Sequence, residues 1–138
     1  MKDKALIVDD NQDILKLVSN YLIKNGVEVD TASDKLMALK KLKSGFYKYA
    51  FIDLHLDETG EQGFDLLDAI REKDARTLMI VLTADSSLSA LLTARSKGAF
   101  DYLYKPNLKN VEVADCLKRC SEFLDRWKQI YLDMKKAS

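Results

Sequence analysis

The sequence has little of the material that marks several protein classes. One proline and five glycines among 138 residues are too few for a collagen-like, mucin-like or low-complexity chain. Two cysteines, Cys116 and Cys120, and a single histidine cannot complete a tetrahedral zinc site, so we expect reduced, buried thiols. No apolar run approaches the roughly 18 residues of a membrane span, so we expect a cytoplasmic protein without membrane insertion.

An excess of either charge is also missing. Lys and Arg total 22, as do Asp and Glu, so the formal net charge is zero. This balance lacks the positive surplus that phosphate backbones require, which argues against direct nucleic-acid binding. The chain has no Gly-x-x-x-x-Gly-Lys loop and no Gly-x-Gly-x-x-Gly turn, so ordinary nucleotide and dinucleotide sites are excluded. The 47% of hydrophobic residues can form one core, and the length fits one compact domain.

Apolar periodicity divides the chain into alternating strands and helices. Short apolar runs predict five strands, at residues 4–8, 27–32, 49–53, 78–83 and 99–104. Helical spacing predicts five helices, at about 11–25, 33–44, 64–73, 86–97 and 110–136. This alternation predicts an α/β fold, a doubly wound parallel sheet with helices on both faces.

Polar residues mark where several of these helices begin. Asn11 is expected to cap the first helix, Ser33 the second, and Ser86 or Ser87 the fourth, because their side-chain oxygens can accept free backbone N–H groups. The second helix carries its apolar positions at Leu36, Leu39 and Leu42.

Polar side chains also stand at the ends of four predicted strands. They are Asp9, Asp10, Asp53, Thr83 and Lys105. In open α/β sheets the reactive crevice lies beyond the carboxyl ends of the strands, so these side chains should converge on one edge. Crowded carboxylates repel one another unless a hard cation lies among them, and Mg²⁺ suits such a site. Asp53 could then act as a nucleophile in phosphoryl transfer.

Four segments resemble the response-regulator receiver domains of two-component signalling, a family that includes chemotaxis regulators. They are Val8-Asp9-Asp10-Asn11, Phe51-Ile52-Asp53-Leu54, Leu82-Thr83-Ala84 and Tyr102-Leu103-Tyr104-Lys105-Pro106. The resemblance covers residues 3–122 and implies a flavodoxin-like sheet of strand order 2-1-3-4-5. It further implies a phosphorylated signalling switch that catalyses only its own phosphoryl transfer and slow dephosphorylation.

The resemblance implies that Asp53 accepts a phosphoryl group from the phosphohistidine of a sensor kinase or phosphotransfer protein. Asp10 and Asp53 would bind Mg²⁺ directly, and Asp9 would act through a water molecule. His55 would add its backbone carbonyl as a further ligand. The loop at residues 55–63 departs from the family pattern, because it lacks a proline, is acidic and looks longer.

The remaining pocket residues would form the switch. By resemblance, Lys105 and Thr83 would hold the phosphoryl oxygens, with Ala84 as the small residue after the hydroxyl. Tyr102 would turn inward and change the binding of an unknown output partner. A receiver-like structural or dimerisation module without phosphorylation is the alternative function. A Mg²⁺-dependent phosphatase is disfavoured, because it would need an acid–base carboxylate where this chain has a histidine.

Two further residues could tune the lifetime of the phosphoryl group. His55 lies two residues after the acceptor, and Asp85 lies two residues after Thr83. In the family these positions influence the attack of water on the acyl phosphate. We hypothesise a His55–Asp85 contact with this role, the alternative being an exposed histidine without one.

The last helix is longer than a receiver domain needs. Apolar residues follow steps of four and three at Val113, Leu117, Cys120, Leu124, Trp127, Tyr131 and Met134. We divide the chain into a receiver domain, residues 1–122, and a C-terminal helical extension, residues 123–138. The apolar seam of the extension, defined as Leu124, Trp127, Tyr131 and Met134, should pack against a second copy in a homodimer, a following domain, or the receiver's own flank.

Overall fold

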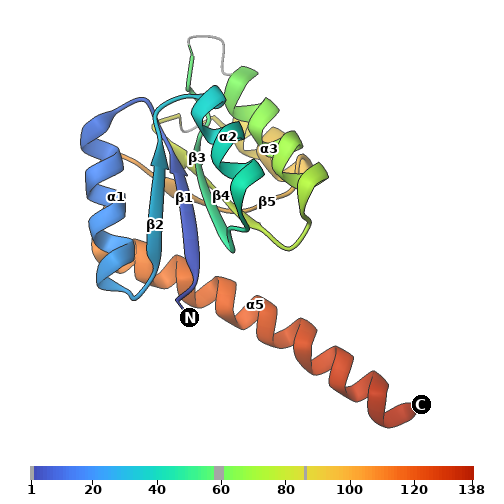
Figure 1. The fold of residues 1–138 in the computed structure, drawn as a ribbon. Helices are drawn as coiled ribbons and strands as arrows, with labels where there is room; N and C mark the ends of the chain where they lie inside the picture. The colour runs from blue at the N-terminus through green and yellow to red at the C-terminus, as the bar shows by residue number, and fades with distance from the viewer. Residues whose placement is uncertain (1, 58–60, 86) are drawn as a thin grey trace.

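The computed structural model describes residues 2–57, 61–85 and 87–138, which form five parallel strands and five helices (Figure 1). The strands are β1 (Lys4–Val8), β2 (Glu28–Ala32), β3 (Tyr49–Asp53), β4 (Leu78–Thr83) and β5 (Ala99–Tyr104). The helices are α1 (Gln12–Lys24), α2 (Lys35–Ser44), α3 (Glu61–Lys73), α4 (Leu88–Ser96) and α5 (Asn110–Ala137). The sheet order is β2-β1-β3-β4-β5, which confirms the predicted doubly wound fold.

Helices cover both faces of the sheet and bury one apolar cluster on each side. The cluster against α1 and α5 is centred on Ile7, Phe51 and Ile80 of the sheet. The cluster against α2, α3 and α4 includes Ile52 and Val81, the neighbours of these residues along the strands. Strands β3 and β4 are buried along their whole length, because central parallel strands are covered from both sides.

Side-chain caps begin three of the helices, and one prediction about them was wrong. Asn11 caps α1 and Ser87 caps α4, as the sequence indicates, whereas Ser86 lies outside the described residues. Ser33 does not cap α2. The carboxylate of Asp34 does so, accepting a backbone N–H of the first turn at 2.8 Å. The cap therefore lies one residue later, because aspartate is as good a cap as serine.

Helix α3 begins at Glu61, three residues before the predicted start at Phe64. Apolar periodicity misses this polar first turn, which contains Gly63. A Cβ on Gly63 would lie 2.5 Å from the carbonyl oxygen of Leu54 and 2.7 Å from that of Asp53. Glycine is therefore required for α3 to pack this closely against the backbone at the end of β3.

Two helices expose leucines that apolar spacing alone would assign to the core. In α2 the buried residues are Ala38 and Leu42, and Leu36 is 75% exposed. In α4 only Ala94 is buried among the described residues, and Leu88 is 68% exposed. Both exposures create apolar surface on the molecule.

Helix α5 is 28 residues long and continues past the sheet, so its C-terminal half extends away from the domain (Figure 1). Its first half buries Val113, Cys116 and Cys120 against the sheet, and both cysteines are free thiols. Across the described parts of the chain, no helix combines the length and the hydropathy needed to cross a bilayer.

Candidate functional site

The carboxyl edge of the sheet gathers most of the buried polar side chains. Among the described residues four polar side chains are buried, and three of them, Asp9, Asp53 and Thr83, stand at this edge. Strands β1, β3 and β4, which they terminate or follow, are adjacent in the sheet. The sheet order therefore brings together residues that lie far apart in sequence, as the strand-end pattern predicts.

Three carboxylates form the centre of the site. Asp9, Asp10 and Asp53 each offer an oxygen within 4.8 Å of the others, and only Asp10 is exposed. Backbone N–H groups fix the two buried carboxylates. The N–H of Asn11 donates to Asp9 Oδ1 and that of His55 donates to Asp53 Oδ1, both at 3.0 Å.

Lys105 supplies the positive charge of the site. Its Nζ lies 2.7 Å from Asp9 Oδ2 and 3.2 Å from Asp53 Oδ1. Its backbone N–H donates to the carbonyl oxygen of Thr83 at 2.8 Å, which anchors the lysine beside the end of β4. Burial raises the pKa of Asp9 above its ordinary value, while the Lys105 ammonium and the Asn11 N–H oppose that rise.

The donor set fits a hard divalent cation. Three carboxylate groups with oxygens this close together are the ligand type that Mg²⁺ prefers. One lysine cannot neutralise three carboxylates, so an added cation would relieve the remaining repulsion. Asp9, Asp10 and Asp53 are thus the residues that could hold Mg²⁺ here.

Thr83 is turned toward the loop that follows its strand. Its Oγ1 accepts the N–H of Asp85 at 2.8 Å and donates to the carbonyl oxygen of Asp85 at 3.3 Å. Ala84 between them is exposed. Tyr102 on β5 is 52% exposed, so its ring points outward in this structure.

A hollow of about 460 Å³ lies between Thr83 and Tyr102, the two residues predicted to form the switch. Its walls are formed by Thr83, Asp85, Leu91, Tyr102 and Tyr104. Sequence reasoning did not single out Leu91 or Tyr104 as part of the site. The alternation along β5 could have indicated Tyr104, because it stands two residues after Tyr102 and on the same face.

His55 and Asp85 lie together across the ends of β3 and β4. His55 Nε2 is 3.5 Å from Asp85 Oδ2, with the side chains 47% and 34% exposed. The backbone N–H of Ser87 donates to Asp85 Oδ1 at 2.8 Å and is the main cause that lowers the pKa of Asp85, with His55 contributing. Within the unusual loop, residues 58–60 lie outside the described residues.

The seam of the C-terminal extension divides into two parts. Leu124 is partly buried and packs against the apolar cluster beneath α5. Trp127, Tyr131 and Met134 are 58%, 57% and 65% exposed. The receiver's own flank therefore covers only the start of the seam. The ring of Phe123, 4.8 Å from that of Phe100 on β5, marks where the helix leaves the domain.

The fold and the site define a class, a flavodoxin-like α/β domain with an acidic, lysine-bridged pocket at the carboxyl edge of its sheet. The model of the response regulator receiver domain matches residues 5–116. The chain belongs to this family, the receiver domains of two-component response regulators. Receiver domains of the family are signalling switches that bind Mg²⁺ at acidic residues and interact with histidine kinases or phosphotransfer proteins.

Individual proteins support the same relationship. The acid tolerance regulatory protein ActR of Rhizobium meliloti (strain 1021) is 36% identical over 105 residues, which cover 75% of this chain and 53% of ActR. NtrX from Brucella abortus has a TM-score of 0.84 at 26% identity, covering 94% of this chain and 29% of that one. A response regulator from Thermotoga maritima has a TM-score of 0.79 at 25% identity, covering 87% and 98% of the two chains. The chain thus spans about half the length of ActR.

Proposed function

We propose that this chain is a phospho-accepting switch in which Asp53 takes a phosphoryl group from a phosphohistidine. A carboxylate oxygen of Asp53 forms the new bond to phosphorus, the bond from phosphorus to the histidine nitrogen breaks, and the partner's imidazole keeps the nitrogen electron pair. The observation that carries this proposal is the buried Asp53 carboxylate beside two further carboxylates and the Lys105 ammonium. This combination places a nucleophile next to the charges that phosphoryl oxygens need.

Each pocket residue has a defined part in this proposal. Asp9, Asp10 and Asp53, with the backbone carbonyl of His55, would hold Mg²⁺, which when bound neutralises charge on the phosphoryl oxygens. Lys105 already lies 3.2 Å from Asp53 and is placed to pair with the anion that forms there. The N–H of His55 keeps the acceptor carboxylate oriented.

The switch would couple Thr83 to Tyr102. A phosphoryl group on Asp53 gives the Thr83 hydroxyl a stronger, charged acceptor than the backbone carbonyl of Asp85 that it contacts at 3.3 Å. When Thr83 turns toward that group, the exposed Tyr102 ring can enter the 460 Å³ hollow between them. The surface around α4 and β5 then changes, and with it the binding of an output partner.

The C-terminal extension would serve assembly. We place the receiver domain at residues 1–122 and the extension at residues 123–138, of which Phe123 and Leu124 still contact the domain. The exposed part of the seam, Trp127, Tyr131 and Met134, follows the four-three spacing of a two-stranded coiled coil. A homodimer through this helix, or a continuation into a further domain, would cover it.

Intact-mass analysis after incubation with acetyl phosphate tests the phosphoryl chemistry directly. We expect one added phosphoryl group with Mg²⁺, and none with a chelator or in the Asp53→Asn variant. Asp57→Asn, in the neighbouring loop, is the matched control and should still be labelled. An unlabelled chain that also fails to bind beryllofluoride would instead support the structural or dimerisation module.

A further inference from the structure

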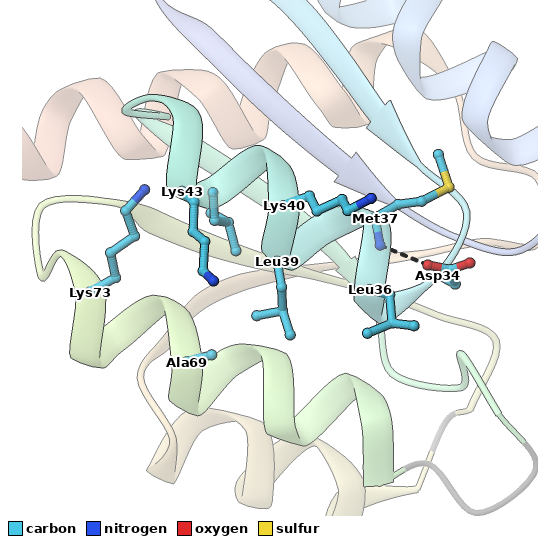
Figure 2. A pocket seen from close by; sticks show the side chains of 9 residues that line it. Asp34, Leu36, Met37, Leu39, Lys40, Lys43, Ala69 and Lys73 are labelled. Atoms are coloured by element: carbon cyan, nitrogen blue, oxygen red, sulfur yellow. Dashed lines mark hydrogen bonds between the residues drawn. The ribbon is translucent and has the colours of Figure 1, made fainter.

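A second concave site lies away from the carboxylates, between helices α2 and α3. It is a groove of about 580 Å³ (Figure 2). Its apolar lining comes from Leu36, Met37, Leu39 and Leu42 of α2 and Ala69 of α3. Leu36 and Met37 belong to the first turn of α2. Figure 2 shows Leu36 and Leu39 projecting from α2 toward the α3 side, where the short side chain of Ala69 lies.

The groove carries more exposed apolar surface than folding requires. Leu36 is 75% exposed, the highest value for a large apolar side chain among the described residues, and Met37 is 41% exposed. Neither is needed to attach α2 to the sheet, because Ala38 and Leu42 do that. An apolar groove with polar edges is the usual form of a site for a partner helix.

The edges of the groove are positively charged. Lys40 and Lys43 come from α2 and Lys73 from α3, against one acidic residue, Asp34. Within the described parts of the chain, Lys40 and Lys43 have no ion-pair partner, and the Lys73 ammonium donates to the carbonyl oxygen of Gly45 at 2.9 Å. The Asp34 carboxylate is engaged in capping α2.

We propose that this groove binds an amphipathic helix of a partner protein that carries acidic residues beside its apolar stripe. Apolar side chains of that helix would enter between Leu36, Leu39 and Ala69. Its carboxylates would pair with the Lys40 and Lys43 ammonium groups on the edge. This interaction requires neither Mg²⁺ nor phosphorylation, so it is separate from the function of the Asp53 site.

The C-terminal extension of a second copy is a poorer occupant on charge. The seam lies among Arg126, Lys128, Lys135 and Lys136 against Asp125 and Asp133, so four positive and two negative charges give plus two. That helix would bring positive charge to an edge that is already positive.

Two labelled peptides of about 16 residues test the proposal. Both carry leucines at helical spacing, with glutamates at the other positions in one and lysines in the second. Fluorescence anisotropy is measured with the full chain in low-salt buffer without Mg²⁺ or phosphodonor. We expect the glutamate peptide to bind about tenfold more tightly than the lysine peptide, and to weaken as salt is added. Equal binding of both peptides, or none, would overturn the proposal.

Variants of the chain then test whether the peptide binds in the groove. Leu36→Ser should weaken binding of the glutamate peptide about fivefold, and the double change Lys40→Glu with Lys43→Glu should reverse the preference to the lysine peptide. Leu36 is exposed, so this change should leave the melting temperature unaltered.

Two control variants make the same kinds of substitution at exposed positions outside the groove. Leu88→Ser removes another exposed leucine, and Lys16→Glu with Lys24→Glu reverses two exposed lysines of α1; both should bind as wild type does. Loss of binding in these controls would contradict the assignment to the groove. Self-association that Leu36→Ser abolishes would assign the groove to a second copy instead.

Discussion

The ammonium of Lys105 lies 2.7 Å from the carboxylate of Asp9, and this ion pair joins the ends of two strands that are not neighbours. Lys105 follows β5 and Asp9 follows β1, with β3 and β4 between them in the sheet. The lysine therefore reaches across the pocket and passes beside Asp53, 3.2 Å away. Asp9 is fully buried, so this cation offsets a charge that water cannot reach.

Removing this cation should destabilise the fold when no metal is present. We expect Lys105→Met to lower the free energy of unfolding by about 2 kcal/mol, because it leaves buried carboxylates unpaired. Mg²⁺ should restore much of the loss, because it supplies charge to the same oxygens. Urea denaturation with and without Mg²⁺ measures both effects. Lys97→Met, which breaks the surface pair with Asp68, is the control and should change stability by less than about 0.5 kcal/mol.

The contact between His55 and Asp85 should lengthen the life of the phosphoryl group. The pair spans the two loops beside Asp53, so removing it opens a path for water. We expect His55→Ala and Asp85→Ala each to dephosphorylate about threefold faster, with no further gain in the double variant, since both remove one contact. Loss of labelled phosphate at constant pH measures the rates. Rates equal to wild type would leave the contact without this role.

Gly63 should tolerate no side chain. We expect Gly63→Ala to cost about 2 kcal/mol of stability, because the new methyl group meets the backbone carbonyl groups of Asp53 and Leu54. Gly45→Ala is the matched control. No atom lies within 4 Å of a Cβ there and the backbone is extended, so its melting temperature should stay near wild type. An equal loss of stability in both variants would show that the lost flexibility of glycine, and not the contact of a Cβ at residue 63 with the backbone of Asp53 and Leu54, causes the effect.

The hydrogen bond between Tyr47 and Asp30 should make the stability of the fold depend on pH. The Tyr47 hydroxyl donates to Asp30 Oδ2 at 2.6 Å and, together with Lys4, lowers the pKa of Asp30. Because the pKa of Asp30 is lower in the folded state than its ordinary value of 3.8, its ionised carboxylate stabilises the fold at pH values above 3.8. This contribution is lost as the pH falls through the lowered pKa. We expect Tyr47→Phe to cost about 1 kcal/mol at neutral pH and to lose less stability on acidification.

The control for that change is Tyr131→Phe, which removes an exposed hydroxyl. Thermal melts between pH 3 and pH 7 should superimpose on wild type for this control. A Tyr47→Phe curve parallel to wild type at every pH would contradict the role of the hydrogen bond.

The exposed seam should drive self-association. We expect sedimentation equilibrium to show a concentration-dependent dimer that Trp127→Glu with Tyr131→Glu shifts at least about tenfold toward monomer, because charge replaces apolar area that the dimer would bury. Val111→Glu with Leu132→Glu, which changes exposed apolar residues of α5 outside the seam, is the control. A monomer at all concentrations would instead favour continuation into another domain.

The sequence predicts a residue's place best where the local pattern of one strand or helix determines it. Asp53 could be placed because a buried apolar strand ends at it, and parallel strands end at one edge. The start of α3 could not, because Gly63 is required by contact with the backbone nine and ten residues earlier rather than by apolar spacing. The exposure of Leu36 was missed for a similar reason. It depends on how far α3 lies from α2 and on which side chains line the space between them, and apolar spacing along α2 reports neither.

The contact between Phe100 and Phe123 makes α5 a lever. Phe100 belongs to β5, the strand that also carries Tyr102, and the Phe123 ring of α5 packs against it. Residues 124–137 extend beyond the contact between these two rings by roughly 20 Å, at 1.5 Å per residue. A tilt of about 10° at the rings would therefore move Met134 and its neighbours by roughly 3 Å.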